Sequence, residues 1–152
     1  MGQFLGTHHN RLDAKGRVSV PAPFRAVLRH AEDPTVVLLP SHKYPCIDGW
    51  PAAAFAELAP PLDSLDLFSD EQEDLQYTLY PDACEVVPDK EGRIVLPDTM
   101  RQHAGLGEQV VFMGIGRRFQ IWEPAAAARR TAEARERANA RRLTVPGRPA
   151  VQ

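Results

Sequence analysis

Alternation of apolar and polar positions predicts that this chain is built mainly from short β-strands. Val18 and Val20 are two residues apart, and so are Ile94 and Leu96, which places each pair on one face of an extended segment. Apolar runs of similar length recur along the chain and are bounded by turn-forming residues. We therefore expect strands at residues 7–12, 17–20, 35–39, 45–48, 83–87, 93–96, 109–113 and 119–122.

Prolines mark where two short helices begin. Pro21 and Pro97 directly follow the alternating pairs, where each ends a strand because it lacks a backbone N–H. The same residue suits the start of a helix, where a missing N–H costs little. The two expected helices are residues 22–30 and 98–104.

Further helices are predicted between the two groups of strands and after them. Ser69 and Gln72 have the spacing of a capping box, in which the first residue caps a helix and the second reaches back to its start. After Pro124 an Ala/Arg/Glu-rich sequence lacks a large apolar stripe, so this helix projects into solvent or packs through alanines. The expected ranges are 52–58, broken by Pro60 and Pro61, then 70–80 and finally 125–143.

The chain contains an internal repeat. Residues 13–25, DAKGRVSVPAPFR, reappear as residues 89–101, DKEGRIVLPDTMR, at a constant offset of 76. The Asp, Gly, Arg, Pro and final Arg are identical, and three positions between them stay apolar. Downstream of these residues the two copies resemble each other more loosely. So ordered a string indicates duplication, and the chain therefore holds two copies of one module.

Each copy begins with a motif that predicts a tight turn. Its aspartate can accept a hydrogen bond from the backbone two residues on, and its glycine tolerates a positive φ. Because extended segments flank the motif, it predicts a hairpin loop closed by a glycine bulge. The expected arms are residues 7–12 and 17–20 in the first copy, and 83–87 and 93–96 in the second.

Charge is distributed unevenly, although the formal net charge is only −2. Residues 1–30 hold five bases and one acid, residues 57–91 hold eleven acids and one base, and residues 117–152 hold nine arginines and three glutamates. Such asymmetry permits a basic surface on a nearly neutral molecule. The acidic middle is expected to be mainly a solvated helix face, with a surface for a protein partner as the alternative.

Several classes of protein are not indicated. No run reaches the roughly 18–20 apolar residues of a membrane helix, and the first residues lack the basic start of a secretory signal. Cys46 and Cys84 show no metal-ligand spacing and are expected to be buried or half-buried thiols. No nucleophile with a partnered base is recognisable. We expect a cytoplasmic protein that is not an enzyme, needs no cofactor or metal, and binds no membrane.

At the doubled motif the sequence closely resembles the MraZ family of bacterial transcription regulators. Residues 4–7 (FLGT), both motifs, residues 101–106 (RQHAGL) and residues 119–123 (FQIWE) carry the likeness, which covers roughly residues 4–127. The resemblance implies two AbrB-like (swapped-hairpin) modules per chain, assembly into a closed ring, and binding to short direct repeats in a promoter. In that family an Asp-x-x-x-Arg signature lies in DNA-facing loops, and here it corresponds to Asp13 with Arg17 and to Asp89 with Arg93.

The two turns therefore hold the candidate DNA-binding residues. A hairpin tip is narrow enough to enter a groove, and an arginine can donate two hydrogen bonds to a phosphate or a guanine. The alternative is that each arginine pairs only with the aspartate of its own turn. Arg25 and Arg101, on the short helices, are expected to make structural pairs within their modules. The predicted DNA-binding residues are Lys15, Gly16, Arg17, Lys90, Gly92 and Arg93, with Asp13 and Asp89 as turn formers.

We expect a mainly β fold with peripheral helices, of the α+β class, in two tandem pseudo-symmetric modules. The expected function is a sequence-specific regulator that binds double-stranded DNA at direct repeats in the promoter of its own division and cell-wall operon. It would act as a homo-oligomeric ring in the cytoplasm and nucleoid. Two alternatives remain, an antitoxin-like protein that also neutralises a toxin and a ring-forming scaffold that binds proteins. The expected division is 4–51 and 82–124 for the modules, 52–81 for linking helices, 125–143 for the C-terminal helix and 144–152 for a disordered tail.

Overall fold

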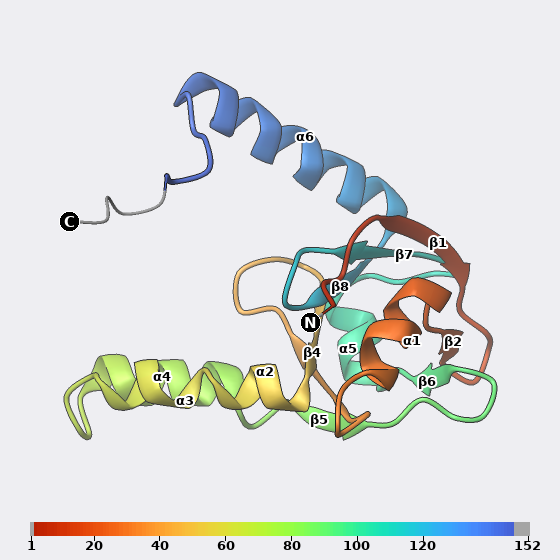
Figure 1. Ribbon diagram of the computed structural model, residues 1–152, viewed down its shortest axis with the longest axis horizontal. Helices are drawn as coiled ribbons and strands as arrows, with labels where there is room; N and C mark the ends of the chain where they lie inside the picture. Colours follow the sequence, from red (N-terminus) through yellow and green to blue (C-terminus); the bar gives the residue numbers. More distant parts are fainter. Residues whose placement is uncertain (1, 148–152) are drawn as a thin grey trace.

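A six-stranded antiparallel sheet and a separate two-stranded ribbon form the centre of this α+β molecule (Figure 1). The computed structural model describes residues 2–147. Its strands are β1 (Thr7–Arg11), β2 (Arg17–Ser19), β3 (Val36–Pro40), β4 (Ile47–Pro51), β5 (Cys84–Val86), β6 (Arg93–Val95), β7 (Gln109–Gly114) and β8 (Phe119–Trp122). Its helices are α1 (Ala22–Arg29), α2 (Ala52–Ala56), α3 (Ala59–Asp63), α4 (Asp70–Leu79), α5 (Asp98–His103) and α6 (Pro124–Ala140).

All eight predicted strands are present, and the helices differ from the prediction at one place. Pro60 and Pro61 lie in the first turn of α3 instead of interrupting helical structure. The first N–H groups of a helix have no partner within it, so prolines are tolerated there. The predicted N-cap is confirmed, since Ser69 Oγ accepts a hydrogen bond from the Gln72 backbone N–H. The reciprocal half of the capping box is wrong, because Gln72 Oε1 accepts from the backbone N–H of Phe68 and not from that of Ser69. The predicted tail from residue 144 lies partly outside the described residues, and positions 144–147 form no helix or strand.

The strands of the two copies are interleaved in one sheet. The strand order is β1-β7-β8-β4-β3-β5, so the β3–β4 hairpin of the first copy and the β7–β8 hairpin of the second lie side by side in the middle. At the edges, β1 pairs with β7 and β5 pairs with β3, and in the ribbon β2 pairs with β6. The prediction that the arms of each turn form a ladder with each other is therefore wrong. Each arm pairs instead with a strand of the other copy.

One hydrophobic core receives side chains from both copies. Val18, Val20, Ile94 and Leu96 are all buried, as their alternation predicts. Phe24 of α1 lies at the centre of an aromatic cluster, with ring centroids 5.3 Å from Phe4, 5.5 Å from Phe119 and 6.3 Å from Phe112. Because both copies supply this cluster, neither copy has a separate core.

The helices outside the core extend away from the sheet. In Figure 1, α6 and the pair α3 and α4 reach toward the left, whereas β2 and β6 lie at the right. Helix α6 is attached through buried Ala127 and through Arg130, whose guanidinium lies 4.2 Å from the Tyr44 ring centroid, which confirms packing through alanines near its start. No helix within residues 2–147 is both long and apolar enough to span a bilayer.

Candidate nucleic-acid interface

Each repeat motif folds into the same closed turn. In the first, Asp13 N–H donates to Arg17 O at 2.9 Å and Gly16 N–H donates to Asp13 O at 3.1 Å, while Gly16 has a φ of 81°. The second turn repeats these bonds between Asp89, Gly92 and Arg93, and Gly92 has a φ of 78°. The left-handed glycine lets the chain re-enter an extended strand directly after the turn. The predicted turn with a glycine bulge is confirmed in both copies.

The aspartate carboxylate organises each turn from inside. Asp13 Oδ1 accepts hydrogen bonds from the backbone N–H of Lys15 at 2.9 Å and of Arg17 at 2.8 Å. Asp89 Oδ1 does the same with Glu91 and Arg93, both at 2.9 Å. These bonds favour the ionised form, and the backbone N–H of Arg17 and of Arg93 is the largest cause that lowers the pKa of Asp13 and Asp89 respectively.

The same carboxylates also hold the two candidate arginines. Arg17 Nε donates to Asp13 Oδ2 at 2.7 Å, and Arg93 Nε donates to Asp89 Oδ2 at 3.3 Å. Arg93 has a second acidic neighbour, because its Nη2 lies 3.0 Å from Glu91 Oε2. The arginine side chains remain 35% and 31% exposed, so pairing within the turn does not remove either from solvent.

The β2–β6 ribbon brings the arginines of both copies onto one face. Its register places Arg17 opposite Val95 and Arg93 opposite Ser19. Residues that lie opposite each other in an antiparallel pair share a face, and so do alternate residues of one strand. These four residues therefore form the outer face of the ribbon, with Ser19 and Val95 exposed, while the intervening Val18 and Ile94 are buried beneath it. Ser19 and Val95 were not among the predicted site residues, because their position depends on pairing with the other copy.

Each turn is backed by a helix arginine of the other copy. Gly16 is buried, and a Cβ there would stand 3.1 Å from Arg101 Cζ; Gly92 is buried against Arg25, with which a Cβ would clash. Arg101 is held by two groups of its own copy, since its Nε donates to Leu96 O at 3.1 Å and its Nη2 pairs with Asp98.

Arg25 differs from its counterpart Arg101. Within the described part of the chain its Nε is buried and has no hydrogen-bond partner. The expected structural pair is therefore confirmed for Arg101 and wrong for Arg25. The reason can be read from the repeat, because Ala22 occupies the position that corresponds to Asp98.

The other residues considered from the sequence are two lysines and two cysteines. Lys15 and Lys90 are exposed at the tips of the two turns. Cys46 is buried and Cys84 half-buried, as predicted, and burial raises the pKa of the Cys46 thiol to about 12. Over residues 2–147 no group of three or more His, Cys, Asp or Glu side chains is placed to hold a metal ion.

Comparison with known proteins gives the same doubled pattern. The model of a family described as "MraZ protein, putative antitoxin-like" matches residues 3–77 and again residues 79–146. The chain belongs to the MraZ family. The two MraZ matches confirm the internal duplication, since each of them contains one of the two turns.

Similar MraZ proteins extend over nearly the whole chain. The "Transcriptional regulator MraZ" of Gluconacetobacter diazotrophicus is 60% identical over 151 residues, covering 97% of this chain and 96% of the relative. That of Gluconobacter oxydans is 57% identical and covers 99% of this chain and 92% of the relative. That of Parvibaculum lavamentivorans is 43% identical, covering 90% and 86%.

Proposed function

We propose that this chain is a sequence-specific DNA-binding transcriptional regulator whose β2–β6 ribbon enters the major groove. The observation that carries the proposal is the position of Arg17 and Arg93 on one outer face of a two-stranded antiparallel ribbon. The major groove admits such a ribbon, and arginine donates two hydrogen bonds to the guanine edge there. The names of the relatives as transcriptional regulators agree with this function.

The other predicted residues support the two arginines in distinct ways. Asp13 and Asp89 hold each guanidinium through Nε and so fix its orientation. This leaves the terminal nitrogens of Arg17 for the ligand, whereas Nη2 of Arg93 is also paired with Glu91. Lys15 and Lys90 add charge for backbone phosphates. Gly16 and Gly92 are buried, so their contribution is to shape the loops against the helix arginines. No cofactor takes part in this function.

The proposal includes the DNA sites, the assembly and the location of the regulator. The regulator binds short direct repeats in the promoter of its own division and cell-wall operon, and it works as a homo-oligomeric ring on DNA in the cytoplasm and nucleoid. Opposite charge on the projecting helices supports head-to-tail contacts between separate chains. Such contacts generate a ring when the rotation from one chain to the next closes. Residues 52–82 hold eight acids and no base, whereas residues 124–142 hold six arginines and two glutamates. A ring would bind successive repeats together and gain affinity through linkage.

Fluorescence anisotropy with the duplex upstream of the protein's own gene, against a scrambled duplex, tests the function. We expect tight binding to the native duplex, and Arg17→Ala and Arg93→Ala should each weaken it by about 1–3 kcal/mol, or roughly 5- to 150-fold. Lys43→Ala, which removes an exposed cation from the loop between β3 and β4, outside the ribbon and outside the charged helices, is the matched control and should bind as the unchanged protein does.

Two results would contradict the proposal. Equal affinity for both duplexes would leave only attraction to the phosphate backbone. No binding to either duplex would instead favour a scaffold that binds proteins through its acidic middle, a surface on which Leu67, Phe68 and Tyr77 are exposed.

A further inference from the structure

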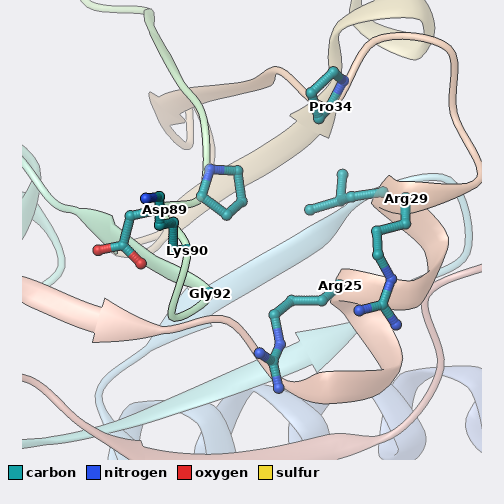
Figure 2. A pocket seen from close by; sticks show the side chains of 8 residues that line it. Arg25, Arg29, Pro34, Asp89, Lys90 and Gly92 are labelled. Atoms are coloured by element: carbon teal, nitrogen blue, oxygen red, sulfur yellow. The ribbon is translucent and has the colours of Figure 1, made fainter.

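A basic cleft lies between the second turn and helix α1 of the first copy (Figure 2). Its volume is about 220 Å³. Three cationic side chains line it, Arg25, Arg29 and Lys90, and Asp89 is the single acid among its lining residues. The cleft therefore holds an excess of positive charge on a chain whose net charge is negative.

Asp89 does not neutralise these cations, because its carboxylate is used within its own turn. Oδ1 accepts from the backbone N–H of Glu91 and Arg93, and Oδ2 accepts from Arg93 Nε. Figure 2 shows the carboxylate pointing away from Arg25 and Arg29. The single acid that lines the cleft thus forms no ion pair with Arg25 or Arg29 in the described structure.

Arg25 also has an unmet hydrogen-bonding requirement. Its Nε is buried and lacks a partner among the described residues, while its side chain lies against Gly92 at the edge of the cleft. A buried charged donor without a partner is unfavourable, and native structures rarely keep one without a role. Arg25 therefore lines the cleft without a protein hydrogen-bond partner for its Nε in the described structure.

The corresponding cleft beside the first turn lacks these properties. It is lined by two arginines, Arg11 and Arg101, and by two acids, Asp13 and Glu108. Arg101 is already bonded to Leu96 O and paired with Asp98, and Ala14 occupies the position that corresponds to Lys90. Two clefts of common origin therefore differ in charge and in the engagement of their central arginine.

The tips of the two turns also differ in charge, and here the first copy carries the more positive charge. Position 15 of the first turn is a lysine, whereas the corresponding residue of the second turn, Glu91, lies against the Nη2 of Arg93. Arg17 has no such second acid among its ion pairs in the described structure. The first turn is thus the more cationic at its tip, and the second is the more cationic in the cleft behind it.

We propose that the cleft of Arg25, Arg29 and Lys90 binds a backbone phosphate of the DNA duplex, and that the two halves of the chain are consequently not equivalent. Both turns present an arginine to the bases, and only the second half also anchors the duplex through its cleft. This inference rests on the proposed DNA-binding function. Phosphate suits the site because guanidinium groups donate to its oxygens in pairs while lysine adds a point charge.

The dependence of DNA affinity on salt tests the proposal, because each neutralised phosphate contributes about 0.9 to the slope of log affinity against log salt. Arg25→Gln should lower that slope by about one and weaken binding to the native and scrambled duplexes by the same factor. Arg101→Gln is the matched control from the corresponding position, and it should leave the slope unchanged. Circular dichroism melting of each variant establishes that it remains folded.

Two further variants protect the test against a folding defect. Arg29 and Lys90 are exposed, so Arg29→Gln and Lys90→Gln should keep the fold while lowering the slope as Arg25→Gln does. In the full-length protein, the ¹⁵N-labelled Nε–H resonance of Arg25 should shift when the duplex is added, and that of Arg101 should not.

The possible failures separate the two proposals. If the unchanged protein binds the native duplex through Arg17 but Arg25→Gln, Arg29→Gln and Lys90→Gln all keep its salt slope, the phosphate site is wrong and the regulator function stands. If Arg101→Gln lowers the slope equally, the non-equivalence of the two halves is wrong. If the unchanged protein binds neither duplex, both proposals fail together.

Discussion

At the scale of single residues, one carboxylate in each turn performs two tasks. The Oδ1 atoms of Asp13 and Asp89 close the loop through backbone N–H groups, and the Oδ2 atoms orient Arg17 and Arg93. An aspartate facing a phosphate would be repulsive on its own. Turned inward, it shapes the loop and fixes the arginine without facing the DNA of the proposed interface.

This arrangement predicts a pH-dependent part of stability. The folded-state pKa of Asp13 and Asp89 is lowered from 3.8, chiefly by the backbone N–H of Arg17 and Arg93 respectively. A lowered pKa stabilises the fold at pH values above 3.8, and that contribution is lost as the pH falls through the lower, folded-state value. The double variant Asp13→Asn, Asp89→Asn should therefore melt at a lower temperature than the unchanged protein near neutral pH, and the difference should shrink below about pH 4.

Thermal melting between about pH 2.5 and 7 measures this difference. Asp82→Asn removes an exposed acid outside the turns and serves as the control for general charge effects. A difference in melting temperature that stays constant across the whole pH range would show that the charge of the carboxylates does not stabilise the turns.

At the scale of elements, the junction between copies depends on a close approach of strands β4 and β8. Gly49 pairs with Phe119, and the Phe119 ring lies over the glycine, where a Cβ would clash with it. The same ring packs 5.3 Å from Phe4 and 5.8 Å from Phe112. A small residue at position 49 thus allows the aromatic cluster to form across the boundary between copies.

Gly49→Ala should destabilise the protein by about 1–3 kcal/mol, because the added methyl forces Phe119 out of a well-packed position. Urea unfolding followed by circular dichroism measures the loss. Gly107→Ala is the matched control, since a Cβ there meets no atom within 4 Å, and it should change stability by less than about 0.5 kcal/mol. Equal stability of the two variants would mean that the ring can move aside freely.

Local signals in the sequence identify the elements but not their partners. Proline positions, alternation and the Ser69 cap depend on neighbours in the chain, and they locate the strands and helices to within a few residues. Strand pairing is set by the burial of Val18 and Ile94, which are 76 residues apart. Sequence alternation is compatible with either pairing, so it predicts a local hairpin although the arms pair across copies.

The candidate site, too, can be predicted from the sequence only in part. The motif places Arg17 and Arg93 in turns from sequence alone, because Asp and Gly at that spacing form a turn by local hydrogen bonds. The shared outer face of the ribbon and the packing of Arg25 on Gly92 require contacts between the copies. The one available signal was the comparison of the copies themselves, in which Ala22 replaces the acid found at position 98.

At the scale of the whole molecule, interleaving makes the two copies one cooperative unit. The sheet interleaves strands of both copies, the ribbon has one strand from each, and the core draws on both. If one copy unfolded, the strands of the other would lose their pairing partners and its core residues would be exposed. A repeat protein made of separate modules would instead unfold one module at a time.

Equilibrium unfolding should accordingly be a single two-state transition, reported equally by both halves. Trp50 belongs to the first copy and Trp122 to the second, so Trp50→Phe and Trp122→Phe each leave one reporter. In each variant the midpoint from tryptophan fluorescence should coincide with that from circular dichroism. The protein concentration is held constant throughout, because association between chains shifts apparent stability. If one reporter changes at a lower urea concentration than the circular dichroism signal of the same variant, the copies unfold separately, and the shared sheet does not couple them.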